Sequence, residues 1–182
     1  HGALIGSIGG RAGVVYHDDV DVMPDLGAAV LAGYNAWMAG VELSRGPAYP
    51  TLLPVASLIG ARPTPLQERA IAVSAGGPIG PADAAVTWRR ARLSDGNSRS
   101  TIDIAVRYAV APGLSVRYGG SSLQYDRRSG LYWDPDAYLS SVAGLEYRNR
   151  PWHGLGLGAH ALFGIARTEA SPFLRDDAAA ID

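Results

Sequence analysis

Few side chains in this sequence have the type and spacing that catalysis or metal binding requires. The histidines His1, His17, His153 and His160 include no two at the helical or hairpin spacing of a metal-binding pair. Cysteine is absent, which excludes disulfides, thiolate metal sites and a cysteine nucleophile. The many serines lie in no G-x-S-x-G motif. We therefore expect a protein with no chemical step, no cofactor and no metal.

Two segments have only part of a known ligand-binding motif. The acidic residues within 18–25 could hold Ca²⁺ loosely, but the segment lacks the glycine and the distal glutamate of an EF-hand. A solvated loop is the favoured interpretation. Residues 77–85, GPIGPADAA, are glycine-rich, but they lack the lysine and the following helix of a phosphate-binding loop.

Charged side chains that share one face of the predicted strands are more informative. Arg89 and Asp103 could form a cross-strand pair, and Arg107 would lie beside Arg117 across a tight turn. Two adjacent arginines repel each other unless an acid from a neighbouring strand or an anionic ligand lies between them. A structural ladder is the favoured interpretation, and a charged constriction that selects a solute is the alternative. The residues expected on this face are Glu42, Arg89, Asp103, Arg107, Arg117, Glu146, Arg148 and His160.

The elements that position these residues are β-strands, because apolar and polar residues alternate along most of the chain. In residues 101–110, TIDIAVRYAV, apolar side chains occupy every second position. No run approaches the ~18 apolar residues of a membrane-spanning helix. The pattern predicts an all-β fold, an antiparallel up-and-down meander of about nine strands. The expected strands are residues 4–17, 26–34, 36–45, 69–76, 83–93, 100–110, 113–126, 137–149 and 153–168.

Short and long connections alternate between these strands, which is the layout of an outer-membrane β-barrel and also of soluble up-and-down barrels. The polar face is rich in Gly, Ser, Thr and Ala with isolated charges, which favours a crowded lumen over a solvated outer surface. The charged residues named above would then line the lumen. Tyr108, Tyr118, Tyr147 and Trp152 lie near strand ends on the short-turn side, where an aromatic girdle is expected.

The loop LYWDPD before the eighth predicted strand fits the same architecture. Tyr132, Trp133 and Tyr138 are expected at the outer rim of the barrel, with the loop acids in water and Pro135 fixing the bend. Stacking of Tyr132 and Trp133 on a sugar is the alternative.

Composition limits the remaining classes. The 182 residues carry 16 basic and 17 acidic side chains, a net charge of −1, so no global field indicates a nucleic-acid partner. The sequence has nine Tyr and four Trp but only two Phe and two Met. Because Tyr and Trp combine an apolar ring with a polar group, this excess is typical of a surface between apolar and aqueous surroundings. We expect residues 1–182 to form a single β-barrel domain that is a fragment of a larger barrel.

Residues 82–168 resemble the C-terminal barrels of the tetratricopeptide-repeat porins that export exopolysaccharides of the cellulose and poly-N-acetylglucosamine type. The similarity lies in a strand, a Tyr-Trp-Asp-Pro loop and a further strand, although no 34-residue helical repeat is present. It implies a bacterial outer-membrane location and partners that include the lipid bilayer, a polysaccharide chain and the outer-membrane assembly machinery. The alternatives are a general outer-membrane channel or structural barrel, a soluble β-barrel that binds a small apolar ligand, and an outer-membrane enzyme.

Overall fold

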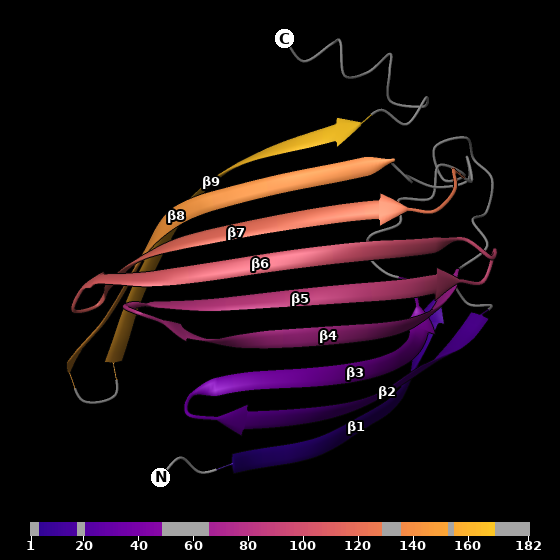
Figure 1. Ribbon diagram of the computed structural model, residues 1–182, viewed down its shortest axis with the longest axis horizontal. Coiled ribbons are helices and arrows are strands. Elements are labelled where there is room, and N and C mark those ends of the chain that lie inside the picture. Colours follow the sequence, from indigo (N-terminus) through magenta and orange to yellow (C-terminus); the bar gives the residue numbers. More distant parts are fainter. Residues whose placement is uncertain (1–3, 18–20, 49–65, 129–135, 153–154, 170–182) are drawn as a thin grey trace.

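The computed structural model describes residues 4–17, 21–48, 66–128, 136–152 and 155–169, and they form one antiparallel sheet (Figure 1). Its strands lie side by side in sequence order from β1 to β9. The all-β meander of nine strands is therefore confirmed. Their bounds are β1 Leu4–His17, β2 Asp21–Tyr34, β3 Trp37–Pro47, β4 Gln67–Ile79, β5 Ala82–Leu93, β6 Ser98–Ala111, β7 Leu114–Tyr125, β8 Ala137–Trp152 and β9 Leu155–Glu169.

β2 and β4 extend furthest beyond the bounds that the sequence pattern predicts. β2 begins at Asp21 rather than at residue 26, because the ladder with β1 continues to the pair His17 and Asp21. The segment expected to be a solvated acidic loop is thus partly strand. β4 extends through Gly77 and Pro78, which pair with β5 although neither residue contributes to an apolar alternation.

The connections alternate in length as expected. At one end of the sheet, tight turns join β2 to β3, β4 to β5 and β6 to β7. Asn35 and Ala36 have φ values of 49° and 66°, as a two-residue hairpin turn with the twist of its strands requires. Gly80 and Gly113 have φ values of 61° and 79° at the other two turns. The longer connections, residues 48–66 and 126–136, lie at the opposite end.

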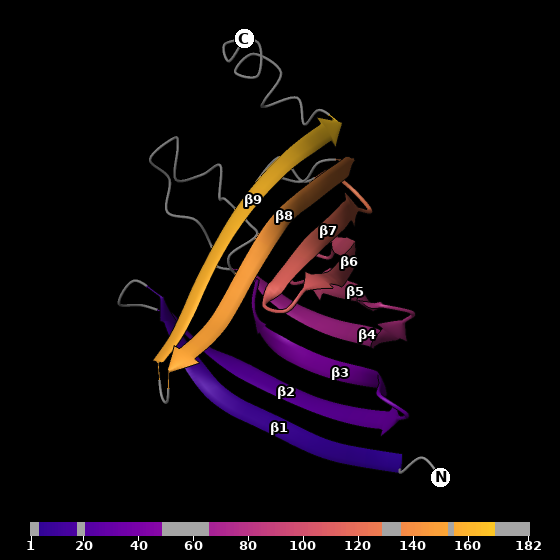
Figure 2. The same cartoon turned by 90° about the vertical axis from the view of Figure 1, so that its left-hand side faces the viewer.

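The sheet is strongly curved (Figure 2). Its two faces differ in polarity. The convex face carries apolar side chains that are exposed, such as Phe163 (80%) and Ile165 (79%). The concave face carries all eight residues expected on the polar face, from Glu42 to His160, and contains a hollow lined by residues from β2 to β9. This is the inverted polarity of a membrane barrel, with an apolar outer surface and a polar interior.

A small core lies at the long-loop end of the concave face. Ala48, Leu93, Leu123 and Tyr125 are buried there, and Leu66 and Tyr138 pack against them. The Ala48 N–H donates to the Leu66 carbonyl at 2.9 Å, which holds the two ends of the long connection together. No helix among the described residues has the length and apolar character to cross a membrane. The sheet is not closed, since β1 and β9 each have one neighbour.

Candidate functional site: the charged concave face

The carboxylate of Glu146 forms ion pairs with three arginines near the short-turn end of the concave face. Glu146 lies 3.3 Å from Arg117 and 3.9 Å from Arg107, and it also pairs with Arg148. Its side chain is only 7% exposed, whereas the three guanidiniums are about half exposed or more. We call these four residues the Glu146 cluster. Ser115 accepts a further hydrogen bond from Arg107 Nε at 3.1 Å.

The Glu146 cluster confirms one expectation from the sequence. Arg107 and Arg117 are direct partners in the β6–β7 ladder, and the acid that relieves their repulsion comes from β8. Asp83 is the β5 partner of Arg107 and lies on the same face. The three arginines Arg107, Arg117 and Arg148 and the two acids Glu146 and Asp83 together give this part of the concave face a net charge of +1.

The prediction that Arg89 pairs with Asp103 is wrong. The β5–β6 register places Arg89 opposite Thr101 and Asp103 opposite Thr87, two positions away on the same face. Asp103 instead accepts a hydrogen bond from Ser121 Oγ at 2.6 Å. The register differs because the turn is tighter than expected, with Arg92 already paired to Ser98.

Arg89 belongs to a second cluster that the sequence pattern did not reveal. Glu68 on β4 pairs with both Arg89 and Arg99, and the side chains of Glu68 and Arg99 are almost fully buried. We call these three residues the Glu68 cluster. Sequence reasoning missed Glu68 because it placed residue 68 in the long connection. It missed Arg99 because that residue adjoins a turn.

Glu42, which was expected on this face, pairs with an arginine from β1. Arg11 donates to Glu42 Oε1 at 3.0 Å and lies 3.4 Å from Asp25 Oδ1. Arg11 was not among the expected residues, although its position in the alternation places it on the polar face. His160 is the direct β9 partner of Glu146 and is exposed.

Between the charged clusters, the concave face is formed by small residues. A hollow of about 680 Å³ lies over Gly76, Ala85, Ala105 and Gly119, which follow one another across β4 to β7. Hydroxyl groups of Ser74 and Thr87 line it on the side of Asp103. Arg107 and Arg117 line it on the other side.

Three of the larger apolar side chains beside the hollow lie against a glycine of the neighbouring strand. Leu31 covers Gly40 and Met38 covers Gly33, so that a Cβ on either glycine would overlap the side chain at 2.3 or 2.4 Å. On the other side of the hollow, Leu162 covers Gly144 in the same way, at 2.6 Å. The glycines thus let these side chains lie flat along the wall instead of projecting into the interior.

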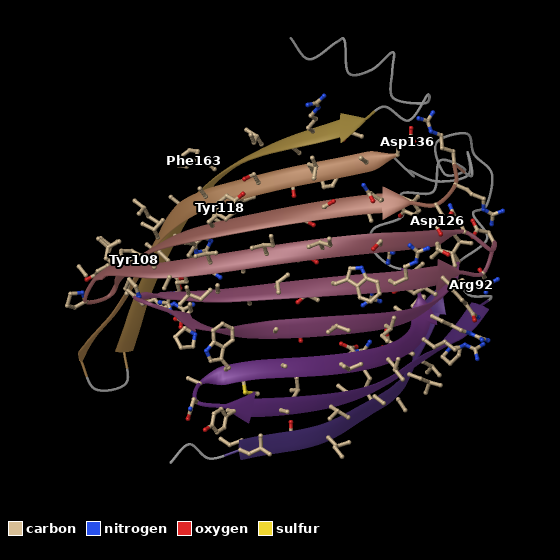
Figure 3. The ribbon with its side chains drawn as sticks, in the orientation of Figure 1. Arg92, Tyr108, Tyr118, Asp126, Asp136 and Phe163 are labelled. Atoms are coloured by element: carbon tan, nitrogen blue, oxygen red, sulfur yellow. The ribbon has the colours of Figure 1, made fainter. Side chains whose placement is uncertain are left out.

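Three of the four aromatic residues expected in a girdle have described side chains, and these lie on the face that the sequence predicts. Tyr108, Tyr118 and Tyr147 are exposed on the convex face, and Figure 3 shows Tyr108 at the short-turn end. Tyr34 and Trp37, direct partners at the β2–β3 turn, join them and are also exposed. The side chain of Trp152 lies outside the described residues.

The aromatic loop residues divide into two groups. Tyr132 and Trp133 lie outside the described residues. Tyr138 is the second residue of β8 and lies at the long-loop end as expected. Its side chain packs against the small core on the concave face rather than at an outer interface. It does so because it shares a face with its partner Leu123.

An exposed ion pair joins the beginning of the β7–β8 loop to its end. Arg128 Nε donates to Asp136 Oδ1 at 2.7 Å, and a second guanidinium nitrogen binds the other carboxylate oxygen. This bidentate hydrogen bonding from Arg128 lowers the pKa of Asp136 below its ordinary value of 3.8. Within the described ranges, no group of three or more His, Asp and Glu could hold a metal ion.

An antiparallel meander with an apolar convex face, a charged concave face and connections of alternating length has the fold of an outer-membrane β-barrel. Two solved structures of OmpT, an outer-membrane protein of Vibrio cholerae, share this fold. The in-vitro folded trimer form matches at a TM-score of 0.65 and 15% identity, over 91% of this chain and 54% of that chain. The form expressed in the outer membrane matches at a TM-score of 0.66 and 17% identity, over 89% of this chain and 51% of that chain.

These matches show the fold of an outer-membrane β-barrel protein. The chain spans about half the length of the two structures. No protein-family model matches the sequence. No curated protein matches it either.

Proposed function

We propose that this sheet forms part of the wall of an outer-membrane channel and that its concave face lines the aqueous path of a solute. The observation that supports this most directly is the opposed polarity of the two faces. Three groups of ionised side chains stand on the concave face, around Glu146, Glu68 and Glu42. The convex face opposite them exposes Ile, Val, Leu and aromatic side chains. Charges on a lumen wall select among passing ions by their sign.

The channel proposal is tested by ion selectivity of the full-length parent protein in planar lipid bilayers. Glu146→Gln removes the one buried acid among three arginines, so we expect the anion-to-cation permeability ratio to rise about twofold. Arg117→Gln should lower the ratio. Arg167→Gln is the matched control, because Arg167 lies on the convex face of β9 beside Leu139. A protein that conducts no ions, or that conducts with unchanged selectivity in all three variants, would contradict the proposal.

A polysaccharide is the more specific solute that we propose for this channel. Its support is the row of neutral hydroxyl groups on consecutive strands, Ser74, Thr87, Ser121 and Ser140, with Asp103 between them. Sugar hydroxyls both donate and accept hydrogen bonds, as these side chains do. Cello-oligosaccharides or N-acetylglucosamine oligomers should reduce the ion current, and Thr87→Val should weaken that block. Equal block by a neutral polyethylene glycol of the same size would contradict the sugar preference.

We further propose that passage involves no chemical step. The purified parent protein in detergent should then hydrolyse neither acyl esters nor peptides above the rate of a detergent blank. Turnover of either substrate class would indicate an outer-membrane enzyme instead.

A further inference from the structure

Three arginines stand in a single row on the convex face. Arg45, Arg69 and Arg92 come from β3, β4 and β5, and each is the direct ladder partner of the next. All three are exposed. We call them the arginine row. Figure 3 shows Arg92 at the long-loop end, the end that also holds Asp126 and Asp136.

Within the part of the chain that the structure describes, the arginine row differs from the arginines of the concave face because it has no acidic partner. Among the described residues, no carboxylate lies within ion-pairing distance of the three guanidiniums, and Arg45 hydrogen-bonds only the neutral Gln67 side chain, at 3.4 Å. By contrast Arg90, one row nearer the middle of the same face, pairs with Asp126. Like charges directly opposite each other on neighbouring strands destabilise a sheet. No described carboxylate therefore offsets the repulsion among the three guanidiniums, and a bound anion would do so.

The position of the arginine row indicates which anion could supply this charge. Leu26 continues the same row on β2, and the next row toward the middle contains Leu43 and Ile71. Beyond them Val73 and Trp88 continue the exposed apolar surface. The guanidiniums thus stand at the border of the apolar band, where the headgroups of a surrounding bilayer would lie.

The spacing of the arginine row suits phosphate groups. Neighbouring strands lie about 4.8 Å apart, so the three guanidiniums extend over roughly 10 Å. Guanidinium forks bind phosphate oxygens with two parallel hydrogen bonds. Arg69 and Arg92 also border a hollow of about 240 Å³ at the ends of β4 and β5, which leaves room beside them.

We propose that Arg45, Arg69 and Arg92 form a binding site for the phosphate groups of anionic membrane lipids. The proposal rests on the outer-membrane channel proposed above only in requiring that the convex face contacts lipid. It does not depend on what the channel conducts. The lipid phosphate replaces the missing carboxylate, so the site is stable when the anionic lipid is bound and is self-repelling without it.

The test compares stability in two kinds of vesicle. The full-length parent protein and its Arg69→Gln variant are unfolded with urea in vesicles of phosphatidylcholine alone and in vesicles that also contain phosphatidic acid. In phosphatidylcholine the variant should be as stable as the parent or more so, because one repulsive charge is gone. With phosphatidic acid the parent should gain stability and the variant should gain clearly less. A purely structural role of Arg69 would shift the stability in both vesicles in the same direction.

Lipid titration in detergent, followed by native mass spectrometry, measures the affinity directly. Each Arg→Gln change in the row should weaken phosphatidic acid binding about fivefold, and the triple variant about a hundredfold. Arg69→Lys keeps the charge but loses the two parallel hydrogen bonds of the guanidinium, so it should bind more tightly than Arg69→Gln and less tightly than the parent. Arg128→Gln is the matched control, because its guanidinium is already paired with Asp136.

Three outcomes would overturn the proposal. The first is equal binding of phosphatidic acid and phosphatidylcholine, and the second is unchanged affinity in the triple variant. The third is displacement of the lipid by millimolar inorganic phosphate, which would indicate a site for free phosphate. Failure here is distinguishable from failure of the channel, because conductance of the same preparation is measured separately.

Discussion

At the scale of single residues, the clusters of the concave face differ in how far their acids are removed from water. Glu68 is nearly fully buried between two arginines, whereas Glu42 and its partner Arg11 have side chains that are 36% and 55% exposed. Removal of a buried charge partner leaves the others uncompensated, while an exposed ion pair contributes little. The same chemical change should therefore have very different consequences at these two positions.

Glu68→Gln should lower the free energy of unfolding by about 3 kcal/mol, because Arg89 and Arg99 would lose the buried carboxylate that pairs with both. Glu42→Gln is the matched control and should change it by less than about 1 kcal/mol. Urea unfolding in phospholipid vesicles measures both. Equal effects of the two substitutions would mean that the burial of Glu68 does not matter.

The Arg128–Asp136 pair gives a prediction with a defined pH range. Because the pKa of Asp136 is lowered from 3.8, the pair is intact above that value and is lost as the pH falls through the lowered pKa. Arg128→Gln should raise the pKa of Asp136 toward 3.8, since the hydrogen bond from Arg128 is the first cause of the shift. A ¹³C NMR titration of the Asp136 carboxyl group tests this. An unchanged titration in the variant would assign the shift to another group.

At the scale of strands and turns, glycine is as important as the apolar alternation. Gly144 lies beneath Leu162, and a Cβ there would come within 2.1 Å of the Ala161 carbonyl oxygen. That backbone atom cannot move without disturbing the β8–β9 ladder. Gly119, on the same face, has only the Ile104 carbonyl oxygen near it, at 3.8 Å.

Gly144→Ala should therefore destabilise the protein by about 1–3 kcal/mol, as overpacking does elsewhere. Gly119→Ala, the matched control, should be nearly neutral because the added methyl group is in ordinary contact. Urea unfolding of both variants in phospholipid vesicles is the measurement. A neutral Gly144→Ala would show that β9 shifts freely against β8.

The sequence predicts the strands better than their ends. Alternation identified all nine, because each strand has one apolar and one polar face. It ended β2 too early, since Asp21 and Pro24 have the composition of a loop and only pairing with β1 makes them strand. Register across a turn was also predicted with variable success. The turn at Pro112-Gly113 places Arg107 beside Arg117 as predicted. The turn before Ser98 is tighter than predicted, so Arg89 and Asp103 lie two residues out of line.

At the scale of the whole molecule, the sequence predicted which residues share a face but not which of them meet. Contacts such as Glu68 with Arg99 join β4 to β6 and depend on long side chains crossing the strand between them. The alternation of apolar and polar residues does not show which side chains contact each other across an intervening strand. The arginine row was missed for a related reason, since it requires the register of three strands at once.

The open sheet has a further consequence that follows from strand direction. Neighbours alternate in direction, so β1 and β9, the first and last of nine, point the same way. A ring in which every neighbour is antiparallel needs an even number of strands. Antiparallel closure of this sheet thus requires an odd number of additional strands between β9 and β1. Joining two copies head to tail around one axis would instead create two parallel seams, whose hydrogen bonds are slanted and slightly weaker per residue.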